Sequence, residues 1–447
     1  QMLCAATTTL LQNAIDAAAT AGGGYAVVPC GFHATGALQL HAGVRLSSAH
    51  CTVTRPDVRR LLTLGACSAA QMHIVEVRNG SGIAISDVRF DATNLTDGST
   101  RSAASVVGGS GAVGFLLEGC HFLNINTSSQ GFSAIQLSGC SGCIVRGNYV
   151  PRSGGDALNF NSGEYVVSEN LVENVGDGCI AMNNNAFGVV AHNVLRRCNL
   201  GVGAGPAGQA VTWNSSTPFT VSSNLIEDCD FGVLLGWFGY AGRIGPTNCI
   251  VAHNIIRRVR SAAIQNNGGP GAFDGAMIIE GNHITHSGFP ATQPPHTSGP
   301  GPGHGIYAVS LRDVHIMNNQ LSHGRGDGIT AMGLHFVVGS NVLSADAAGS
   351  NATAISVADA VDVAVSGNDI RGFARGVAAS DKDRVTVRAN SIDVSHSTAS
   401  VGVSVGAGVA RCVVSENTVS GSASADACVA IDGAASASRV ARNNECW

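Results

Sequence analysis

Aromatic and charged residues are both scarce in this sequence. Of its 447 residues, 5% are aromatic and 12% are charged, whereas glycine reaches 58 residues. So few aromatic side chains exclude a large conventional core, and so little charge argues against disorder. The chain is also too long for one ordinary core, yet no linker divides it, so we predict a single domain over 1–447. A stacked repeat avoids the size limit, because each repeat contacts only its neighbours.

Basic surface and long apolar runs are missing too. The net charge is −5 and Lys382 is the only lysine, which excludes the basic face that a nucleic-acid partner requires. No apolar run approaches the ~20 residues of a membrane span. We predict no cofactor and no metal, and calcium stays an alternative that no motif indicates. The chain begins at Gln1 without a signal peptide, as expected of a mature secreted form.

Cysteine, by contrast, is frequent. There are 14 cysteines and no paired CxxC motifs at zinc spacing, so we predict disulfides in an oxidising compartment, with buried thiols as the alternative. Cys198 and Cys229 occupy matching places in RRCNLGV and EDCDFGV, and we predict that they pair across one rung. Glycosylation sequons fit a secreted protein as well, although they also arise by chance. They lie at Asn79, Asn94, Asn126, Asn214 and Asn351.

A short pattern recurs along the chain: a few β-branched or apolar residues, an asparagine, then Val, Ile or Leu, as in VRGNYV and VSENLV. The asparagines are spaced by 22 residues at the shortest and 37 at the longest. Such spacing indicates a repeat with loops inserted into some copies. The asparagines are Asn148, Asn170, Asn193, Asn224, Asn254, Asn282, Asn319, Asn341, Asn368, Asn390, Asn417 and Asn443.

A single copy of the repeat predicts the coil. After Asn170, residues 171–172 begin a second strand, 176–178 form a turn, 179–182 form a third strand and 189–191 form the next first strand. Three short strands in ~22 residues make a parallel β-helix coil. We therefore predict an all-β fold, a single-stranded parallel β-helix of about 12–13 coils. The asparagines would form a ladder at one turn, where stacked amides bond successive rungs.

The N-terminus has a different character. The pattern of residues 10–19 predicts a helix, which the glycines at 22–24 end. A strand is predicted at 25–29. Residues 1–30 would therefore form a short capping helix and the first strand. The segment LLQNAIDAAATAGGGYAVVPCGFHATGALQLHAGVRL resembles the N-terminal cap and first coil of the pectin-lyase-like superfamily. The resemblance implies a right-handed helix of the polysaccharide hydrolase or lyase type, with polysaccharide bound along the third-strand sheet.

Four consecutive intervals between Asn193 and Asn319 are long. Loops on both borders of the third strands would form a groove over 193–319, and plain surface decoration is the alternative. The insertions are Pro206–Pro218, Trp237–Asn248, Asn267–Gly275 and Gly288–Gly303.

The predicted groove contents suit sugar. Trp213, Trp237 and Tyr240 lie in insertions, where aromatic faces could stack on sugar rings. Neutral amide side chains suit the hydroxyl groups of a sugar, whereas an anionic polyuronate usually requires cationic side chains in the groove. The third strands carry Asn159, Asn161, Asn183, Asn185, Gln265, Asn267 and Tyr307, of which we predict Asn183, Gln265 and Asn267 as sugar ligands.

Acidic residues recur just before the third strands. Asp177 and Asp230 should lie two rungs apart, roughly 9.5 Å, which matches the general acid and base of inverting glycosidases. The alternative is that they cap turns, because Gly-Asp-Gly is a common turn sequence that also occurs at Asp327. The whole row is Asp156, Asp177, Asn199, Asp230, Arg260, His304 and Asp327.

Other catalytic candidates come from the loops. Asp274 and Glu280 are alternative carboxyls, in and just after an insertion. Gly303-His304-Gly305 is similar to the Gly-His-Gly of polygalacturonases, but their Asn-Thr-Asp, Asp-Asp and Arg-Ile-Lys motifs are missing, so that activity is not expected. His304 with Tyr307 could instead serve a lyase or epimerase as base and acid, or His304 could be a plain loop residue.

These patterns together predict a secreted carbohydrate-active enzyme that cleaves a polysaccharide or cell-wall glycan, with a glycoside hydrolase favoured. A polysaccharide lyase or epimerase using the same groove is one alternative. A non-catalytic extracellular structural or adhesion protein is the other, because the ladder alone explains most of the sequence.

Overall fold

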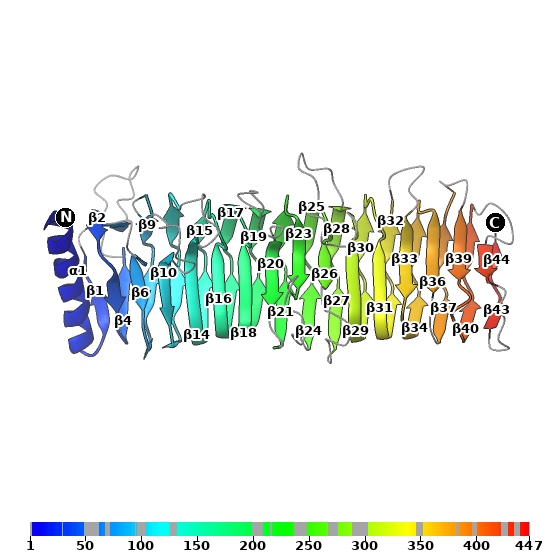
Figure 1. The fold of residues 1–447 in the computed structure, drawn as a ribbon, viewed down its shortest axis with the longest axis horizontal. Helices are drawn as coiled ribbons and strands as arrows, with labels where there is room; N and C mark the ends of the chain where they lie inside the picture. The colour runs from blue at the N-terminus through cyan, green and yellow to red at the C-terminus, as the bar shows by residue number, and fades with distance from the viewer. Residues whose placement is uncertain are drawn as a thin grey trace. The chain divides into compact units, whose positions relative to one another are not determined.

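The computed structural model describes most of the chain. It covers residues 2–28, 30–48, 62–67, 72–93, 95, 104–125, 132–198, 209–214, 217–236, 248–266, 276–287, 303–345, 352–380, 384–395, 400–421, 428–432 and 439–446. The chain divides into two compact units, Gln1–Ser215 and Ser216–Trp447, called unit 1 and unit 2 below. Each unit is a stack of parallel β-coils (Figure 1).

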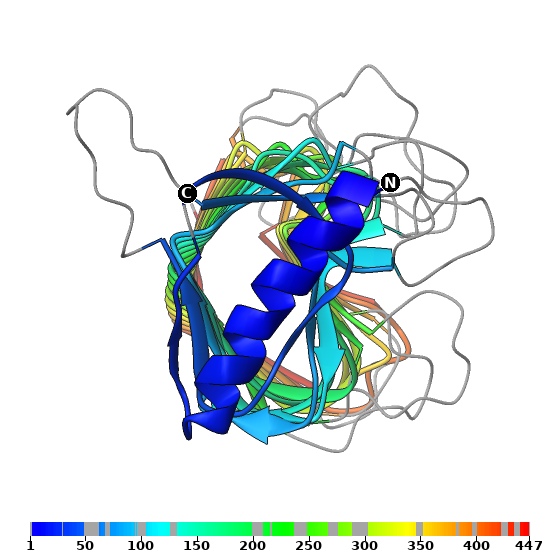
Figure 2. The same ribbon diagram turned by 90° about the vertical axis from the view of Figure 1, so that its left-hand side faces the viewer.

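Helix α1 (Met2–Thr20) covers the N-terminal end of the coils in unit 1 (Figure 2). Its apolar side chains Leu11 and Ile15 are buried. The Gln12 amide bonds to both backbone groups of Gln39, at 2.9 and 3.0 Å, and Cys4 forms a disulfide with Cys67. The capping helix is thus confirmed, and it begins eight residues earlier than predicted, in a segment where Thr8 Oγ1 donates to the Cys4 carbonyl at 2.7 Å.

Unit 1 builds three faces, named after the first, second and third strands of a coil. The second sheet contains β2 (Gly31–Thr35), β5 (Leu62–Ala66), β9 (Arg89–Asp91), β13 (His121–Leu123), β15 (Tyr149–Val150), β17 (Leu171–Val175) and β19 (Val194–Cys198). The first sheet starts with β1 (Gly24–Ala26), β4 (Val44–Ser47), β8 (Ala84–Ser86) and β12 (Leu116–Glu118). The third starts with β3 (Leu38–Leu40), β6 (Val75–Val77) and β10 (Ala104–Ser110).

Later strands of unit 1 run without interruption from the third sheet into the first. They are β14 (Phe132–Arg146), β16 (Leu158–Ser168) and β18 (Ile180–Ala191), followed by the third-sheet strand β20 (Gln209–Asn214). The third strand of this coil bends into the first strand inside β18, where Asn184 and Asn185 have φ of 49° and 69°. Asparagine tolerates this left-handed conformation better than most residues.

Unit 2 repeats the same plan. Its second sheet contains β22 (Leu225–Glu227), β25 (Ile255–Val259), β28 (His283–Ser287), β30 (Gln320–Ser322), β32 (Val342–Ser344), β35 (Asp369–Arg371), β38 (Ser391–Asp393), β41 (Thr418–Ser420) and β44 (Glu445–Cys446). The other two sheets share β29 (Ile306–Met317) and β31 (Ile329–Gly339). Aligned inward residues form the core, as in the buried column Val314, Phe336, Val363 and Val385.

The asparagine ladder is present in both units. In unit 1, Asn148 Nδ2 donates to Asn170 Oδ1 at 2.9 Å, and Asn170 Nδ2 donates to Asn193 Oδ1 at 3.0 Å. In unit 2 the same bond links each rung to the next from Asn224 onward. Every described ladder asparagine up to 417 is buried, so these bonds satisfy polar groups that water does not reach.

The last rung corrects the prediction. Asn417 Nδ2 donates to Asn444 Oδ1 at 2.9 Å, so Asn444 rather than Asn443 completes the ladder. The residue before a ladder asparagine adopts a left-handed conformation, as Glu416 does at φ 59°, and Asn443 takes that place at φ 51°. The sequence Asn-Asn offers both candidates, and only the backbone conformation separates them.

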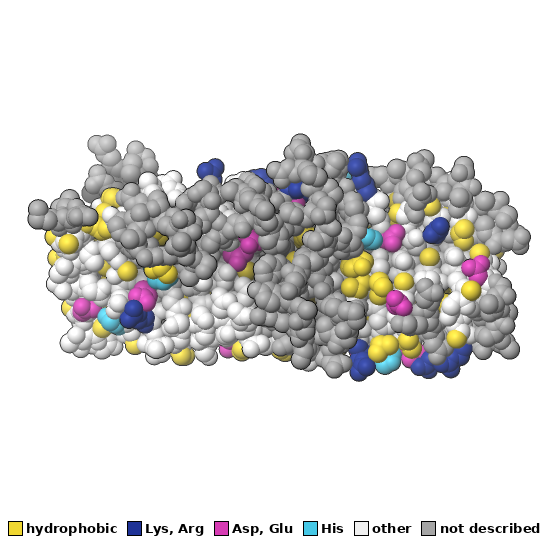
Figure 3. Space-filling view, viewed as in Figure 1, with side chains coloured by type: hydrophobic (Ala, Val, Ile, Leu, Met, Phe, Trp, Pro, Cys, Tyr) yellow, Lys and Arg dark blue, Asp and Glu magenta, His cyan; other side chains and the backbone are white. Residues whose placement is uncertain are grey.

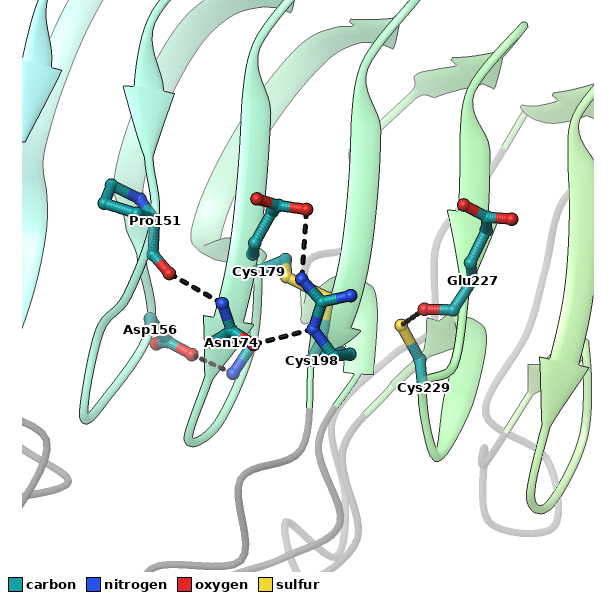
Figure 4. The surroundings of a disulfide bond; sticks show 10 residues. Pro151, Asp156, Asn174, Cys179, Cys198, Glu227 and Cys229 are labelled. Atoms are coloured by element: carbon teal, nitrogen blue, oxygen red, sulfur yellow. Dashed lines mark hydrogen bonds and ion pairs between the residues drawn. A yellow bond between two sulfur atoms is a disulfide. The ribbon is translucent and has the colours of Figure 1, made fainter. Parts of the chain in front are cut away.

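The predicted disulfide between Cys198 and Cys229 is wrong. Cys198, at the end of β19, bonds to Cys179 within unit 1 (Figure 4). Cys198 pairs in register with Val175. The turn that follows Val175 then brings the sulfur of Cys179 to the sulfur of Cys198. In unit 2 the Cys229 thiol donates to the Glu227 carbonyl at 3.2 Å.

Removing the Cys179–Cys198 crosslink by a double substitution to serine is expected to lower the unfolding free energy by about 3 kcal/mol. The disulfide joins residues with a sequence separation of 19, and this closed loop lowers the conformational entropy of the unfolded chain. Urea unfolding of both proteins measures the loss. The difference should vanish when both are reduced, and a difference that persists after reduction would assign the effect to packing instead.

A row of ion pairs runs along the second sheet in each unit. In unit 1, Arg197 bonds to Glu173 at 3.1 Å, with Arg196 at 3.7 Å from the same carboxylate. In unit 2, Arg257 forms an ion pair with Glu227. Each carboxylate is already paired with a part-exposed arginine of the next rung, so these pairs help to hold rungs in register and do not mark a site.

Candidate functional site

Several predicted site residues fall outside the described part of the chain. They are Trp237, Tyr240, Asn267, Asp274 and the sequon residues Asn94, Asn126 and Asn351. Among the other sequons, Asn79 is exposed and Asn214 ends β20. These assignments stay predictions.

Two predicted sugar ligands are corrected. Trp213 was expected in an exposed insertion, but it lies on β20, pairs in register with Met182 and is 0% exposed. Gln265, on β26 (Ile264–Asn266), is also 0% exposed. Neither side chain presents a face to a polysaccharide.

The position of β20 explains the error at Trp213. Val211 pairs with Ile180, so residues 209–214 are the third strand of their coil rather than part of an insertion at 206–218. Asn199 lies outside the described residues. The alternation of apolar and polar residues in Val211-Thr212-Trp213-Asn214 is the signal, and the preceding glycine-rich stretch obscures it.

The third sheet of unit 1 presents a neutral polar surface. Its outward positions alternate with buried apolar residues along β14, β16 and β18. Figure 3 shows mostly neutral side chains on the part of β14, β16 and β18 that the grey residues leave in view. The outward residues are Gln136, Ser138, Asn159, Asn161 and Asn183.

Asp156 lies at the border of this surface, in the turn before β16 (Figure 4). Its Oδ1 accepts from the Gly178 backbone N–H at 2.9 Å, and its Oδ2 accepts from Asn159 Nδ2 at 2.7 Å. Burial raises the pKa of this carboxyl to about 6, against the two hydrogen bonds, which lower it. Asp156 is therefore ionised at neutral pH, and two hydrogen bonds fix the position of its carboxylate.

Asp177 lies on the neighbouring rung and is not held in this way. Burial, followed by the Asp156 charge, raises the pKa of Asp177 to about 8. No described residue donates a hydrogen bond to its carboxyl. At neutral pH Asp177 therefore keeps its proton, whereas its neighbour Asp156 is ionised. This difference suits Asp177 to act as an acid and Asp156 as a base or nucleophile.

The alternative of simple turn caps applies to Asp327 but not to Asp177. Asp327 lies two residues before Ile329, and its Oδ1 accepts from the Thr353 N–H at 2.9 Å. Asp156 occupies the equivalent place in its own coil, two residues before Leu158. Asp177 lies three residues before Ile180, one place away from the capping position.

Asp230, the predicted partner of Asp177, belongs to unit 2. Its Oδ1 lies 2.6 Å from Arg260 Nε, and both side chains are largely buried. The Asp230 carboxylate is thus engaged in an ion pair. The pairing of Asp177 with Asp230 stays a prediction, and Asp156 is the carboxyl that sequence reasoning passed over.

His304 and Tyr307 come together in unit 2, as predicted. Their ring centroids are 5.2 Å apart, and Thr330 Oγ1 lies 3.5 Å from His304 Nδ1. Burial lowers the pKa of His304, partly offset by Asp327, and burial raises the pKa of Tyr307. The pair therefore holds a neutral imidazole beside a protonated phenol.

A shallow groove of about 380 Å³ on the first sheet of unit 2 carries no comparable chemistry. His335 Nδ1 lies 2.9 Å from Asp313 Oδ1, and Asp362 pairs with both His335 and Arg384. Because these groups neutralise one another along the rungs, they resemble the structural row of the second sheet. Within the described residues, no His, Cys, Asp and Glu cluster could hold a metal ion, and no helix is long and apolar enough to cross a membrane.

The parallel coils, the ladder and the capping helix define a β-helix protein. The profile of the right-handed β-helix region matches residues 73–240 and 302–445, and the chain belongs to this family. No curated protein matches. The disulfides are compatible with an extracellular location.

Solved structures with a similar fold come from several sources. The tailspike protein of Escherichia coli bacteriophage HK620, in complex with a pentasaccharide, is 14% identical over 98% of this chain and 74% of its own, with a TM-score of 0.45. The Streptococcus pneumoniae surface adhesin PfbA is 10% identical over 98% and 96%, with a TM-score of 0.40. The A-module of the Azotobacter vinelandii mannuronan C-5 epimerase AlgE6 is 13% identical over 98% and 95%, with a TM-score of 0.33. These similarities do not decide an activity.

Proposed function

We propose that the protein is an extracellular glycoside hydrolase that binds a polysaccharide along the third sheet of unit 1 and cleaves it at Asp156 and Asp177. The observation that carries the proposal is Asp177. It is a part-buried carboxyl with a raised pKa, it lies beside a second carboxyl, and no described residue holds it. Perturbed carboxyl pairs of this kind are typical of catalytic sites.

The chemistry follows from the two protonation states. Asp177 gives its proton to the glycosidic oxygen as the bond from that oxygen to the anomeric carbon breaks. The Asp156 carboxylate attacks the anomeric carbon, and water later displaces it and returns a proton to Asp177. Adjoining rungs are ~4.8 Å apart, close to the ~5–5.5 Å carboxyl spacing of retaining enzymes, so this course is favoured over inversion.

A panel of polysaccharides tests the proposal. New reducing ends without ultraviolet-absorbing unsaturated products are expected from at least one substrate. Retention of anomeric configuration, followed by proton NMR at early times, is expected for that substrate. Binding without turnover of any member would contradict a hydrolase and favour the non-catalytic extracellular alternative.

A lyase or epimerase in unit 2 is the second candidate, and the His304–Tyr307 pair favours it. A neutral imidazole can remove a proton next to a carboxylate, and a protonated phenol can return one. Unsaturated or epimerised uronate products that disappear in a His304→Ala variant would support this candidate. Their absence with every polyuronate tested would exclude it.

The carboxyl pair also predicts how stability depends on pH. The folded pKa values of about 6 and about 8 exceed the ~3.9 of an unfolded aspartate. The folded state binds more protons in that window, so this contribution is fully present below about pH 4 and is lost as pH rises through 8. Asp177→Asn should therefore raise Tm by a few degrees near pH 9 and change it little near pH 4.

Thermal unfolding at both pH values measures this effect. The matched control is Asp327→Asn, which weakens a backbone hydrogen bond and should lower Tm at both. A uniform loss of stability in Asp177→Asn would mean that Asp177 is another turn cap.

A further inference from the structure

Three asparagine amides form a directed chain that ends on Asp156. Asn184 Nδ2 donates to Asn161 Oδ1 at 3.0 Å, and Asn161 Nδ2 donates to Asn159 Oδ1 at 2.7 Å. Asn159 Nδ2 then donates to Asp156 Oδ2 at 2.7 Å. Every amide in the chain points its donor toward the carboxylate, which fixes the rotamers of all three side chains.

This chain leaves donors for a ligand. An asparagine amide has two N–H groups, and in Asn159 and Asn161 one of them is used within the chain. No described residue accepts from the second. Both side chains are part-exposed at outward positions of β16, in register with Gln136 and Ser138 of β14. Two oriented donors on part-exposed side chains therefore have no described acceptor beside the carboxyl pair.

The surface around these donors is uncharged. None of the outward residues of β14, β16 and β18 on the third sheet is charged, and the Asp156 carboxylate lies at the border of this surface. An anionic sugar would meet a carboxylate there without a compensating cation, and like charges repel. A neutral sugar can accept from the amides through its hydroxyl oxygens and meets no such cost.

We propose that this amide surface is a sugar subsite that selects neutral pyranosides, with Asn161 as a binding residue and Asn159 as a positioning residue that orients Asp156. The subsite assignment stands on the amide geometry, whereas the positioning role rests on the proposed function of the carboxyl pair. Substrate hydroxyls would take the second N–H of each amide, so substrate and Asp156 are aligned by the same side chains.

Binding by the full-length protein tests the subsite. Affinity electrophoresis with neutral chains (a glucan, a mannan and a galactan) and with polygalacturonate and alginate should show binding to at least one neutral chain and none to the polyuronates. Asn161→Ala should weaken that binding about tenfold, as expected for the loss of one oriented donor. The control Asn185→Gly, which changes an exposed asparagine outside the chain and keeps its positive φ, should bind as wild type. Tighter binding to a polyuronate, or unchanged binding by Asn161→Ala, would overturn the subsite.

Asn159→Ala tests the positioning role. Asn159 Nδ2 donates to Asp156 Oδ2 at 2.7 Å, and Asp177 is the titratable group on the neighbouring rung, so loss of the Asn159 donor should leave Asp156 with less support for its ionised form. The limb of the pH–rate profile that reports Asp156 should move to higher pH, with kcat lowered and KM little changed. ¹³C titration of the carboxyl should show the same shift without substrate. Lowered stability with an unmoved pH profile would overturn the role.

The two proposals fail in different ways. Loss of neutral-glycan binding in Asn161→Ala without hydrolysis by wild type would retain the subsite and reject the hydrolase. Hydrolysis that Asn161→Ala and Asn159→Ala leave intact would retain the hydrolase and reject the subsite.

Discussion

Asp177→Asn is expected to lower kcat for polysaccharide hydrolysis about 10³-fold, because the amide cannot supply the proton that the leaving oxygen requires. Affinity for the polysaccharide should be nearly unchanged, since the amide has the shape of the protonated carboxyl that it replaces. Reducing-end release and affinity electrophoresis on the same preparation separate the two effects. A variant that binds and hydrolyses as wild type does would exclude Asp177 from the chemistry.

Two matched variants sharpen that result. Asp156→Asn removes the carboxylate that Asp177 faces and should be comparably inactive. Asp327→Asn changes an aspartate in the same Gly-Asp-Gly sequence, but one that bonds to the Thr353 backbone, and it should retain activity. Equal losses in Asp177→Asn and Asp327→Asn would indicate that both act through the turn rather than through catalysis.

Asn341→Ala should lower the unfolding free energy by about 3–5 kcal/mol, an effect unusually large for removal of a polar side chain. The Asn341 amide is buried and makes four hydrogen bonds of 2.9–3.0 Å. Truncation leaves the Ile316 carbonyl and the Asn319 N–H buried without those partners. Urea-induced unfolding, followed by circular dichroism, measures the loss.

The control for the ladder is Asn318→Gly. Asn318 precedes a ladder asparagine, is exposed and has φ 57°, which glycine adopts without strain. Its substitution should change the unfolding free energy by less than about 1 kcal/mol. Similar losses in Asn318→Gly and Asn341→Ala would show that the amide bonds of the ladder add little.

The strands and the ladder could be predicted because each rung repeats the same local chemistry. One asparagine per rung marks one turn, so the spacing in the chain measures the coil directly. Prediction failed where two adjacent residues of the same type fitted the repeat equally well. Asn443 and Asn444 are adjacent, and the left-handed conformation of Asn443 decides between them.

Trp213 shows why an insertion is harder to predict than a rung. An irregular interval shows that residues have been added, but not on which side of a strand they lie. Pairing of Val211 with Ile180 places Trp213 in the core and removes it from the candidate binding residues. The sequence also does not show how deeply a strand residue is buried, so it did not predict the burial of Gln265.

The sequence by itself determined the β-helix, the ladder, the capping helix and the acidic row, because these depend on periodic local preferences that any copy of the repeat reveals. Only the tertiary structure decided which acid is a cap and which is not. Asp156, Asp177 and Asp327 occur in similar turns, and a shift of one residue relative to the third strand gives Asp177 a different environment. A pKa depends on burial and on the neighbouring rung, and both are properties of the packed coils rather than of the local sequence.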